Sequence, residues 1–256
     1  MEDKEIMEIA LDAGHILLEN GAEIFRVEET IDRICRYYGL ESGSAFVLSN
    51  GIFLTAGSER ENFFAKVQHI PVSGTHLDKV AAVNQLSREI EQGKYTTEQV
   101  REELERIRKM PGKRKWVQVL ASGIGSAAFC MLFGGNLIDS LVAFGAGVIL
   151  YIYVLQVGIH FSKIVGNILG GLLVTMFCGL FYHFGIGKHL NFMIIGAIMP
   201  LIPGVAFTNA IREIADADYI SGTVRMMDAL VGFLSIAIGV GMGTVLLHHL
   251  VGGIVL

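Results

Sequence analysis

Five apolar runs of about 20 residues fill the second half of the sequence, and a helix of that length can cross the hydrocarbon core of a bilayer. All but four of the 20 Lys and Arg residues, and all but five of the 25 Asp and Glu residues, precede Trp116. We therefore predict a membrane α-helical protein, with a small cytoplasmic α+β domain (1–110) followed by a five-helix transmembrane domain (111–256). The predicted spans are residues 116–134, 137–159, 164–184, 190–211 and 228–250.

The first 110 residues have the periodicities of a folded α+β domain. Apolar residues recur at spacings of three and four through 3–38, which predicts two amphipathic helices that are separated at Asn20-Gly21. Two β-rich runs flank Ser49-Asn50-Gly51, where Asn-Gly would supply the positive φ of a tight hairpin. A third strand is expected within 62–72. Helices are expected at 76–91 and 97–109, the second capped within Thr96–Glu98.

The basic residues before the first run predict the orientation of the chain in an inner membrane. Lys109, Lys113, Arg114 and Lys115 directly precede Trp116, and short basic segments stay on the cytoplasmic side. The acidic N-terminal segment has no apolar leader, so we expect the N-terminal domain to stay in the cytoplasm. Five crossings would then place the C-terminus outside.

Several other classes of function lack a signature. The net charge of −5 and the absence of a basic face argue against nucleic-acid binding. Three widely spaced cysteines, Cys35, Cys130 and Cys178, suggest buried thiols rather than a disulfide framework or metal site. No P-loop for ATP occurs, and without a nucleophile elbow hydrolysis is unsupported; no cofactor is expected. The charged residues of "GAEIFRVEET" are read mainly as helix-start acids, with a polar patch as the alternative.

The fourth run contains a break. Pro200 and Pro203 lack N–H groups and are followed by Gly204, so the helix should be interrupted there. Freed backbone groups are tolerated within a membrane only where they face protein or a wet cavity. A half-helix that restarts after Gly204 would point the N–H groups of Val205 and its neighbours at a carboxylate. The alternative is a plain proline kink.

Three polar residues follow this break. Thr208 and Asn209 could bind an ammonium or hydroxyl group of the same small solute. Arg212, one turn later, could attract an anion. Deeper in the apolar runs, Gln156 and Asn167 could line the path or hydrogen-bond a neighbouring helix.

Acidic residues near the runs are candidates for gating or coupling. Asp139 and Asp228 stand where helix N-termini are predicted, so capping is the preferred reading and proton coupling the alternative. Asp216 and Asp218 fall in the predicted 207–227 loop, either as solvated turn residues or as part of a gate.

Glycines at four-residue spacing mark close helix packing. Gly166 and Gly170 lie in one run, and Gly239 and Gly243 in another. Small residues at this spacing let helix backbones approach in lipid. The contacts are expected within the chain, with a partner subunit as a further possibility.

Three segments, "GAEIFRVEETI", "PLIPGVAFTNAIREI" and "DYISG", together resemble the N-terminal half of the threonine/serine exporter family, in the split form of YjjP-type proteins. The resemblance implies an inner-membrane exporter of threonine and serine or of succinate. It also implies a separately encoded five-span partner, because full-length members join two such halves. The family motif falls on Pro200, Pro203, Gly204, Thr208, Asn209, Arg212, Asp218, Ser221 and Gly222.

The leading hypothesis is a subunit of an ion-driven secondary exporter for small carboxylate-bearing solutes, working as an oligomer with this partner. One alternative is a membrane-anchored enzyme that acts through its cytoplasmic domain. The other is a scaffold subunit that does not itself transport.

Overall fold

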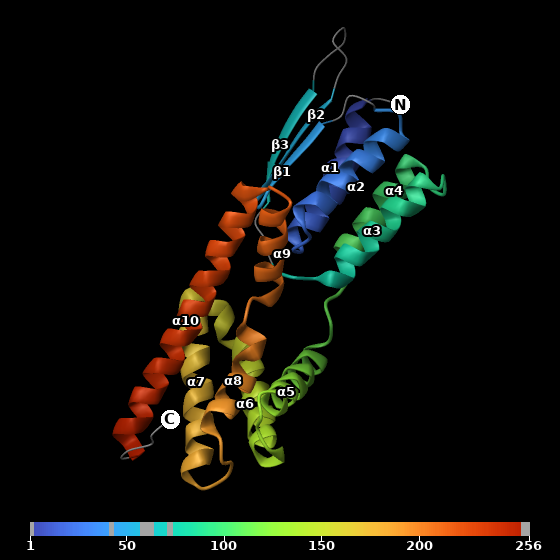
Figure 1. Ribbon diagram of the computed structural model, residues 1–256. Coiled ribbons are helices and arrows are strands. Elements are labelled where there is room, and N and C mark those ends of the chain that lie inside the picture. Colours follow the sequence, from blue (N-terminus) through green and yellow to red (C-terminus); the bar gives the residue numbers. More distant parts are fainter. Residues whose placement is uncertain (1–2, 41–43, 57–63, 71–73, 252–256) are drawn as a thin grey trace. The chain divides into compact units, whose positions relative to one another are not determined.

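The computed structural model describes residues 3–40, 44–56, 64–70 and 74–251 (Figure 1). The chain forms two compact units. The first unit contains Met1–Gly112 together with Val205–Met226, and the second contains Lys113–Gly204 together with Met227–Leu256. A segment from the predicted transmembrane half therefore belongs to the same compact unit as the N-terminal domain.

The first unit is layered, with a helix pair between a sheet and a second helix pair (Figure 1). Helices α1 and α2 pack against strands β2 and β1 on one side and against α3 and α4 on the other. The elements are α1 (Asp3–Glu19), α2 (Ile24–Tyr37), β1 (Ser44–Leu48), β2 (Gly51–Ala56), β3 (Phe64–His69), α3 (Leu77–Glu91), α4 (Thr97–Arg108), α9 (Gly204–Ala215) and the first turns of α10 (Tyr219–Val251).

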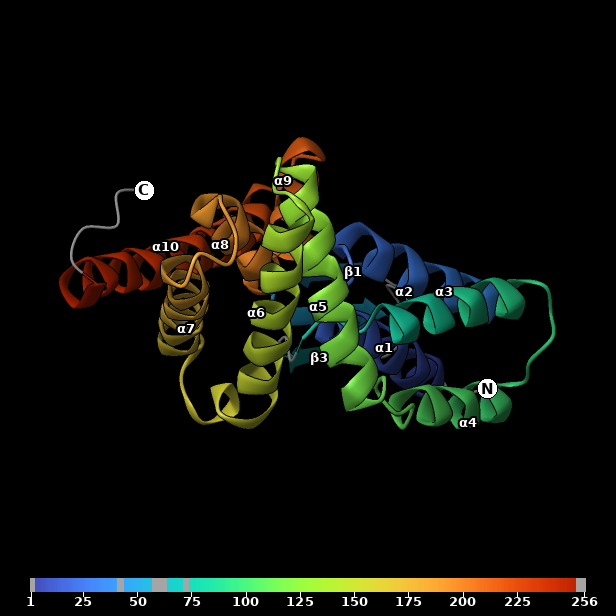
Figure 2. The ribbon, with the colours of Figure 1, turned by 90° about the horizontal axis from the view of Figure 1, so that it is seen from below.

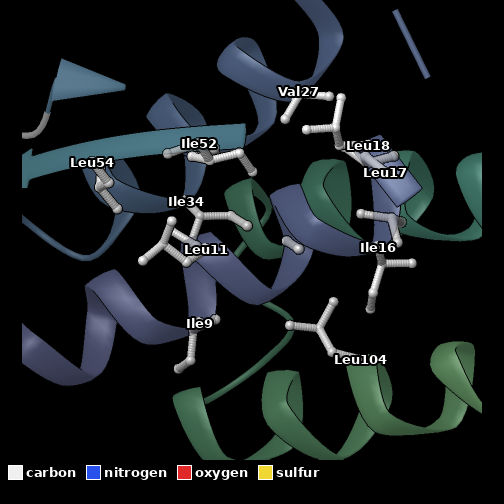
Figure 3. Close-up of a cluster of buried hydrophobic side chains, with 14 of the residues drawn as sticks. Ile9, Leu11, Ile16, Leu17, Leu18, Val27, Ile34, Ile52, Leu54 and Leu104 are labelled. Carbon is white, nitrogen blue, oxygen red and sulfur yellow. The ribbon is translucent and has the colours of Figure 1, made fainter. Parts of the chain in front are cut away.

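The core of this unit surrounds α1, which is buried along most of its length. Figure 3 shows Leu11 beside Ile34 of α2, with Ile52 and Leu54 of the sheet above and Leu104 of α4 below. Burying one such side chain stabilises a fold by about 1.5–3 kcal/mol. The predicted three- and four-residue periodicity is confirmed for α1 and α2, because both helices form and their buried residues include those at the predicted spacing.

The sheet is antiparallel in the order β1-β2-β3. The predicted hairpin is confirmed, but its expected turn chemistry is wrong. Neither Asn50 nor Gly51 has a positive φ. The two-residue loop is Ser49-Asn50, and Gly51 already pairs as a strand residue with Leu48. A Cβ on Gly51 would lie 3.3 Å from Gln68 O, so the glycine permits close strand approach.

Local side-chain chemistry sets several helix ends. Gly21, with φ of 82°, ends α1 as the Asn20-Gly21 pair predicts. Thr96 and Gln99 form a capping box at α4. Asn136 and Asp139 form a second box at the start of α6, which confirms the capping role expected of Asp139.

The second unit is a helical bundle seen well in Figure 2, where α5 lies along α6. Helix α8 packs against α5, α6 and α7. Close approach depends on small residues, since a Cβ on Gly196 of α8 would lie 2.7 Å from Ser126 O of α5. The elements are α5 (Lys115–Leu132), α6 (Leu137–Gln156), the 3₁₀ turn η1 (Gly158–His160), α7 (Lys163–His183), α8 (Leu190–Ile198), the 3₁₀ turn η2 (Met199–Leu201) and the remainder of α10.

Within the described residues, four helices are long and apolar enough to cross a membrane. Leu190–Leu201 and Gly204–Ala215, bent by 69° at their junction, would make a fifth span if counted together. Helix α10 begins at Tyr219, nine residues before the predicted 228, so the expected 207–227 loop is wrong. Its place is taken by α9, a short turn and the start of α10.

Partnering of the charged residues explains the early start of α10. Asp218 Oδ1 accepts the Ser221 N–H at 3.3 Å and so caps the helix. Arg225, which falls in the predicted loop, and Asp228, the expected cap, are each paired with a residue of another helix. Arg225 pairs with Glu213 at 3.0 Å, and Asp228 pairs with Lys163 at 2.5 Å. The expectation that Asp228 caps the last span is therefore wrong.

Candidate functional site: the interrupted helix and the α1–α2 turn

The predicted interruption at Pro200 and Pro203 is confirmed. Helix α8 ends at Ile198, η2 follows, and α9 begins at Gly204. The Ile202 N–H donates to Met199 O at 3.1 Å, and the Gly204 N–H donates to Ile202 O at 2.8 Å. These tight local bonds replace the helical ladder because the two proline nitrogens carry no hydrogen.

In the second unit, Pro203 lies beside α10 and α7. A Cβ on Gly232 of α10 would lie 3.2 Å from Pro203 Cγ and 3.8 Å from Asn167 Nδ2. Asn167 is half-buried and lies close to the break. This position is compatible with both predicted roles, lining the path or hydrogen-bonding a neighbouring helix. Gln156 is the last residue of α6 and is exposed.

The first turns of α9 carry the predicted solute-binding groups. The N–H groups of Val205 and Ala206 belong to the first turn, where no intrahelical acceptor is available. Thr208 is exposed, and its hydroxyl donates to Val205 O at 3.0 Å. The threonine hydroxyl therefore already has a helical partner.

The other two predicted residues contact the turn between α1 and α2. Asn209 Nδ2 donates to Gly21 O at 3.2 Å. The Arg212 guanidinium forms an ion pair with Glu23, which also pairs with Arg26 at 2.6 Å. Asn209 and Arg212 thus hold the turn Asn20–Glu23, which we name the α1–α2 turn.

A buried ion pair lies next to these contacts. Glu213 is 2% exposed, and its Oε1 lies 3.0 Å from Arg225 Nη1 and 3.4 Å from the Ile24 N–H. Arg225 Nη2 also donates to Ala22 O at 3.0 Å. The α1–α2 turn is therefore bonded to both α9 and α10. Sequence reasoning missed Glu213, because its partners Ile24 and Arg225 are distant along the chain.

The predicted gating segment forms the α9–α10 turn. Asp216 is exposed, whereas Asp218 is half-buried and caps α10. Ser221 is fully buried, and within the described residues its hydroxyl has no hydrogen-bond partner. A Cβ on Gly222 would lie 2.9 Å from Ile214 N, so this glycine brings the backbones of α9 and α10 together.

The charged residues near the start of α2 have separate roles. Glu23 faces α9, whereas Glu28 Oε1 accepts the Val47 N–H of β1 at 3.1 Å. Burial raises the pKa of Glu28, and the charge of Asp218 adds to the rise. Glu23 is the N-cap residue of α2 and makes no side-chain capping bond, and the first turn of α2 holds no acid, so the reading as first-turn acids is wrong for Glu28 and Glu29.

An open cleft of ≈ 380 Å³ lies elsewhere in the first unit, at the C-terminal part of α2 and the end of α3. Glu29 pairs there with Arg33 at 2.6 Å, and burial raises the pKa of Asp32. The mixture of acids and arginines gives the cleft no dominant charge. Its lining residues are Glu29, Asp32, Arg33, Arg36, Tyr37 and Glu91.

In the second unit, Asp139 does more than cap α6. It is fully buried and accepts the Lys188 N–H at 2.6 Å. Its other oxygen lies 2.8 Å from His189 Nδ1. Asp139 therefore ties the start of α6 to the loop before α8.

The thiols and potential metal ligands are dispersed. Cys35, Cys130 and Cys178 are free and buried, and burial raises the pKa of Cys35 to about 12. Among the residues that the structure describes, no group of three or more His, Cys, Asp or Glu side chains could hold a metal ion.

Several apolar helices, one of them interrupted by prolines, define a multi-pass α-helical membrane protein of the transporter class. The chain belongs to the threonine/serine exporter family, ThrE, whose model matches residues 8–247. The family and the relatives described below are transporters, so the chain is a membrane exporter protein and not an enzyme.

Relatives of two lengths match the chain. "Probable succinate transporter subunit YjjP" of Klebsiella aerogenes is 24% identical, with 94% of this chain and 93% of that protein covered. The YjjP protein of Escherichia coli is also 24% identical, with 94% of each chain covered. "Threonine/serine exporter" of Corynebacterium glutamicum is 23% identical, but the match covers 93% of this chain and 50% of that protein. No solved structure matches the chain significantly.

Proposed function

We propose that the chain is one subunit of a secondary exporter that moves small carboxylate-bearing metabolites out of the cytoplasm. Threonine, serine and succinate are the first candidates, since they appear in the names of the relatives. A separate five-span subunit would complete the path. The YjjP proteins are named as subunits, and the Corynebacterium exporter is about twice as long as the matched region.

The proposed topology has five spans, with α8 and α9 counted as one bent span. A cytoplasmic N-terminal domain is supported by the basic residues Lys109, Lys113, Arg114 and Lys115 before the first span. The C-terminus is then external. Because the sequence contains no P-loop for ATP, we propose that an ion gradient drives export.

The interrupted helix is the observation that carries this proposal. A helix that restarts at Gly204 offers a positive dipole end and first-turn N–H groups, which suit a solute carboxylate. Within the second unit, Asn167 lies near Pro203, where the break occurs. Transporters commonly build their substrate sites from helices broken in this way.

In this proposal, Asn209 and Arg212 hold the α1–α2 turn in place until solute binding breaks their contacts with it. In the described conformation they hold Gly21 and Glu23. The Arg212–Glu23 pair is exposed on the arginine side, so its rupture costs little. Release of the α1–α2 turn would free an amide and a guanidinium for the solute. The turn Asp216–Asp218 would serve as the hinge between α9 and α10, with Ser221 and Gly222 in the first turn of α10 beside it.

Export from cells tests this function. The genes for this chain and for its partner subunit would be deleted from a strain, and both chains would then be expressed again. This chain would carry Thr208→Ala, Asn209→Ala or Arg212→Ala. Efflux of labelled threonine, serine and succinate is expected to fall at least severalfold in these variants at normal abundance. Arg101→Ala, an exposed arginine of α4, is the control and should export normally. Wild-type efflux from all three variants would remove the site assignment.

A further inference from the structure

Glu213 occupies a site built for a carboxylate. Its Oε1 receives the N–H of Ile24, the first residue of α2, at 3.4 Å and the Arg225 guanidinium at 3.0 Å. A helix N-terminus combined with an arginine is a strong binding arrangement for a carboxylate. The N-terminus of α2 and Arg225 could therefore hold the carboxylate of a solute as well as that of Glu213.

Only one of the two carboxylate oxygens of Glu213 is hydrogen-bonded. Glu213 Oε2 is buried and, within the described residues, has no hydrogen-bond partner. Arg225 Nη2 is directed to Ala22 O, so the pair is not the bidentate arrangement that a permanent Arg–carboxylate bridge favours. A buried carboxylate with one unsatisfied oxygen is costly when ionised. A proton on Oε2 would remove that cost.

Charged residues of both signs act on Glu213. Arg225 acts on it from α10, Glu23 from the start of α2 and Asp218 from the α9–α10 turn. Arg212 and Arg26 are engaged with Glu23, and Glu28 lies near enough to Asp218 for their charges to interact. Three acids and three arginines thus surround Glu213, so the reason for it to take up a proton is its unsatisfied Oε2: the acids are Glu23, Glu28 and Asp218, and the arginines are Arg26, Arg212 and Arg225.

We propose that Glu213 and Arg225 form a proton-linked carboxylate site, in which Arg225 binds Glu213 when Glu213 is ionised and binds the solute carboxylate when Glu213 is protonated. This inference rests on the proposed export of carboxylate-bearing solutes. The proton comes from water and is returned to water when the solute leaves and Glu213 rejoins Arg225. The α1–α2 turn covers the site, and its exposed Arg212–Glu23 pair is the contact that opens first.

Linkage of this kind has a measurable signature, because binding of solute and of proton must favour each other. For the purified chain with its partner subunit, addition of succinate, threonine or serine should cause uptake of one proton per site. On the alkaline side of the Glu213 titration, the solute Kd should rise about tenfold per pH unit. Glu213→Gln should bind without proton uptake and with a Kd that does not depend on pH. Arg225→Gln should weaken binding at least 100-fold.

The control is Glu91→Gln, an exposed acid at the end of α3, which should keep the wild-type proton uptake. Infrared difference spectra of the wild-type chain supply a measurement that needs no variant, since solute should produce one new protonated-carboxyl band. Solute binding without proton uptake, or proton uptake retained in Glu213→Gln, would overturn the linked site while leaving export intact. Failure of the wild-type chain to bind or export any of the three solutes would instead overturn the proposed function, and this inference with it.

Discussion

The Glu213 carboxylate lies 3.0 Å from the Arg225 guanidinium, and this pair joins α9 to the first turns of α10. The side chains are 2% and 10% exposed, so both charges are largely removed from water. The same two residues bond the backbone of Ile24 and Ala22. The helix that follows the proline break is thereby fastened to the N-terminal domain through one buried pair.

Loss of one partner of this pair should be more harmful than loss of both. Arg225→Met leaves Glu213 buried without its cation and is expected to lower stability by about 3–5 kcal/mol. Adding Glu213→Leu should recover most of that loss, because no buried charge remains. Thermal unfolding of the purified chain in detergent measures both variants. Additive losses in the double variant would show that the two residues act independently.

Two glycines on α10 give a matched test of helix contact in the second unit. A Cβ on Gly239 would overlap the backbone carbonyl of Ile168 in α7, whereas a Cβ on Gly241 would meet nothing within 4 Å. Gly239→Ala should separate the helices and cost about 1–3 kcal/mol. Gly241→Ala should be neutral or stabilising by up to about 1 kcal/mol. Equal melting temperatures for the two variants would contradict the α7–α10 contact.

Restoring the helix at the break should impair export. In Pro200→Ala/Pro203→Ala the missing N–H groups return, so the ladder from α8 into α9 can form. Efflux of the preferred solute should fall at least tenfold while abundance stays normal. Pro111→Ala, between α4 and α5, controls for proline loss elsewhere. Unchanged efflux in the double variant would show that the break is only a kink.

Glu28 predicts a pH dependence of stability. Burial raises its pKa in the folded chain, so the folded state holds the proton more tightly than the unfolded state. Stability should therefore fall as pH rises from the ordinary glutamate range through the raised folded pKa. Glu28→Gln keeps an acceptor for the Val47 N–H but has no charge to bury. It should melt higher than the wild type at neutral pH and equally at low pH. A lower melting temperature at neutral pH would refute this account.

The sequence predicts local structure well where it depends on residues close to one another in the chain. The apolar spacing of α1 and α2 and the Asn136–Asp139 capping box depend on neighbours within a few residues, and the structure contains all three. The predicted start of α10 is too late because Arg225 falls in the predicted 207–227 loop and Asp228 reads as a helix cap. Their partners, Glu213 and Lys163, become visible only once the chain is folded.

The candidate site also contains local features, which the sequence predicts, and long-range contacts, which it does not. Proline chemistry is local, so the break at Pro200 and Pro203 follows from the sequence. The contacts of Asn209 with Gly21 and of Arg212 with Glu23 span 188 and 189 residues. Spacing along α9 carries no information about such distant partners. The two residues were accordingly expected to face only a solute.

Substrate protection of α9 tests the central claim most directly, namely that the first turns of this helix line the solute path. Thr208→Cys places a thiol on an exposed position, and the native Cys35, Cys130 and Cys178 are buried. Ser162→Cys, exposed before α7, is the control. In the reconstituted transporter, the exported solute should slow maleimide labelling at residue 208 severalfold and leave labelling at 162 unchanged. Labelling at 208 that proceeds at the same rate with saturating solute would contradict the account.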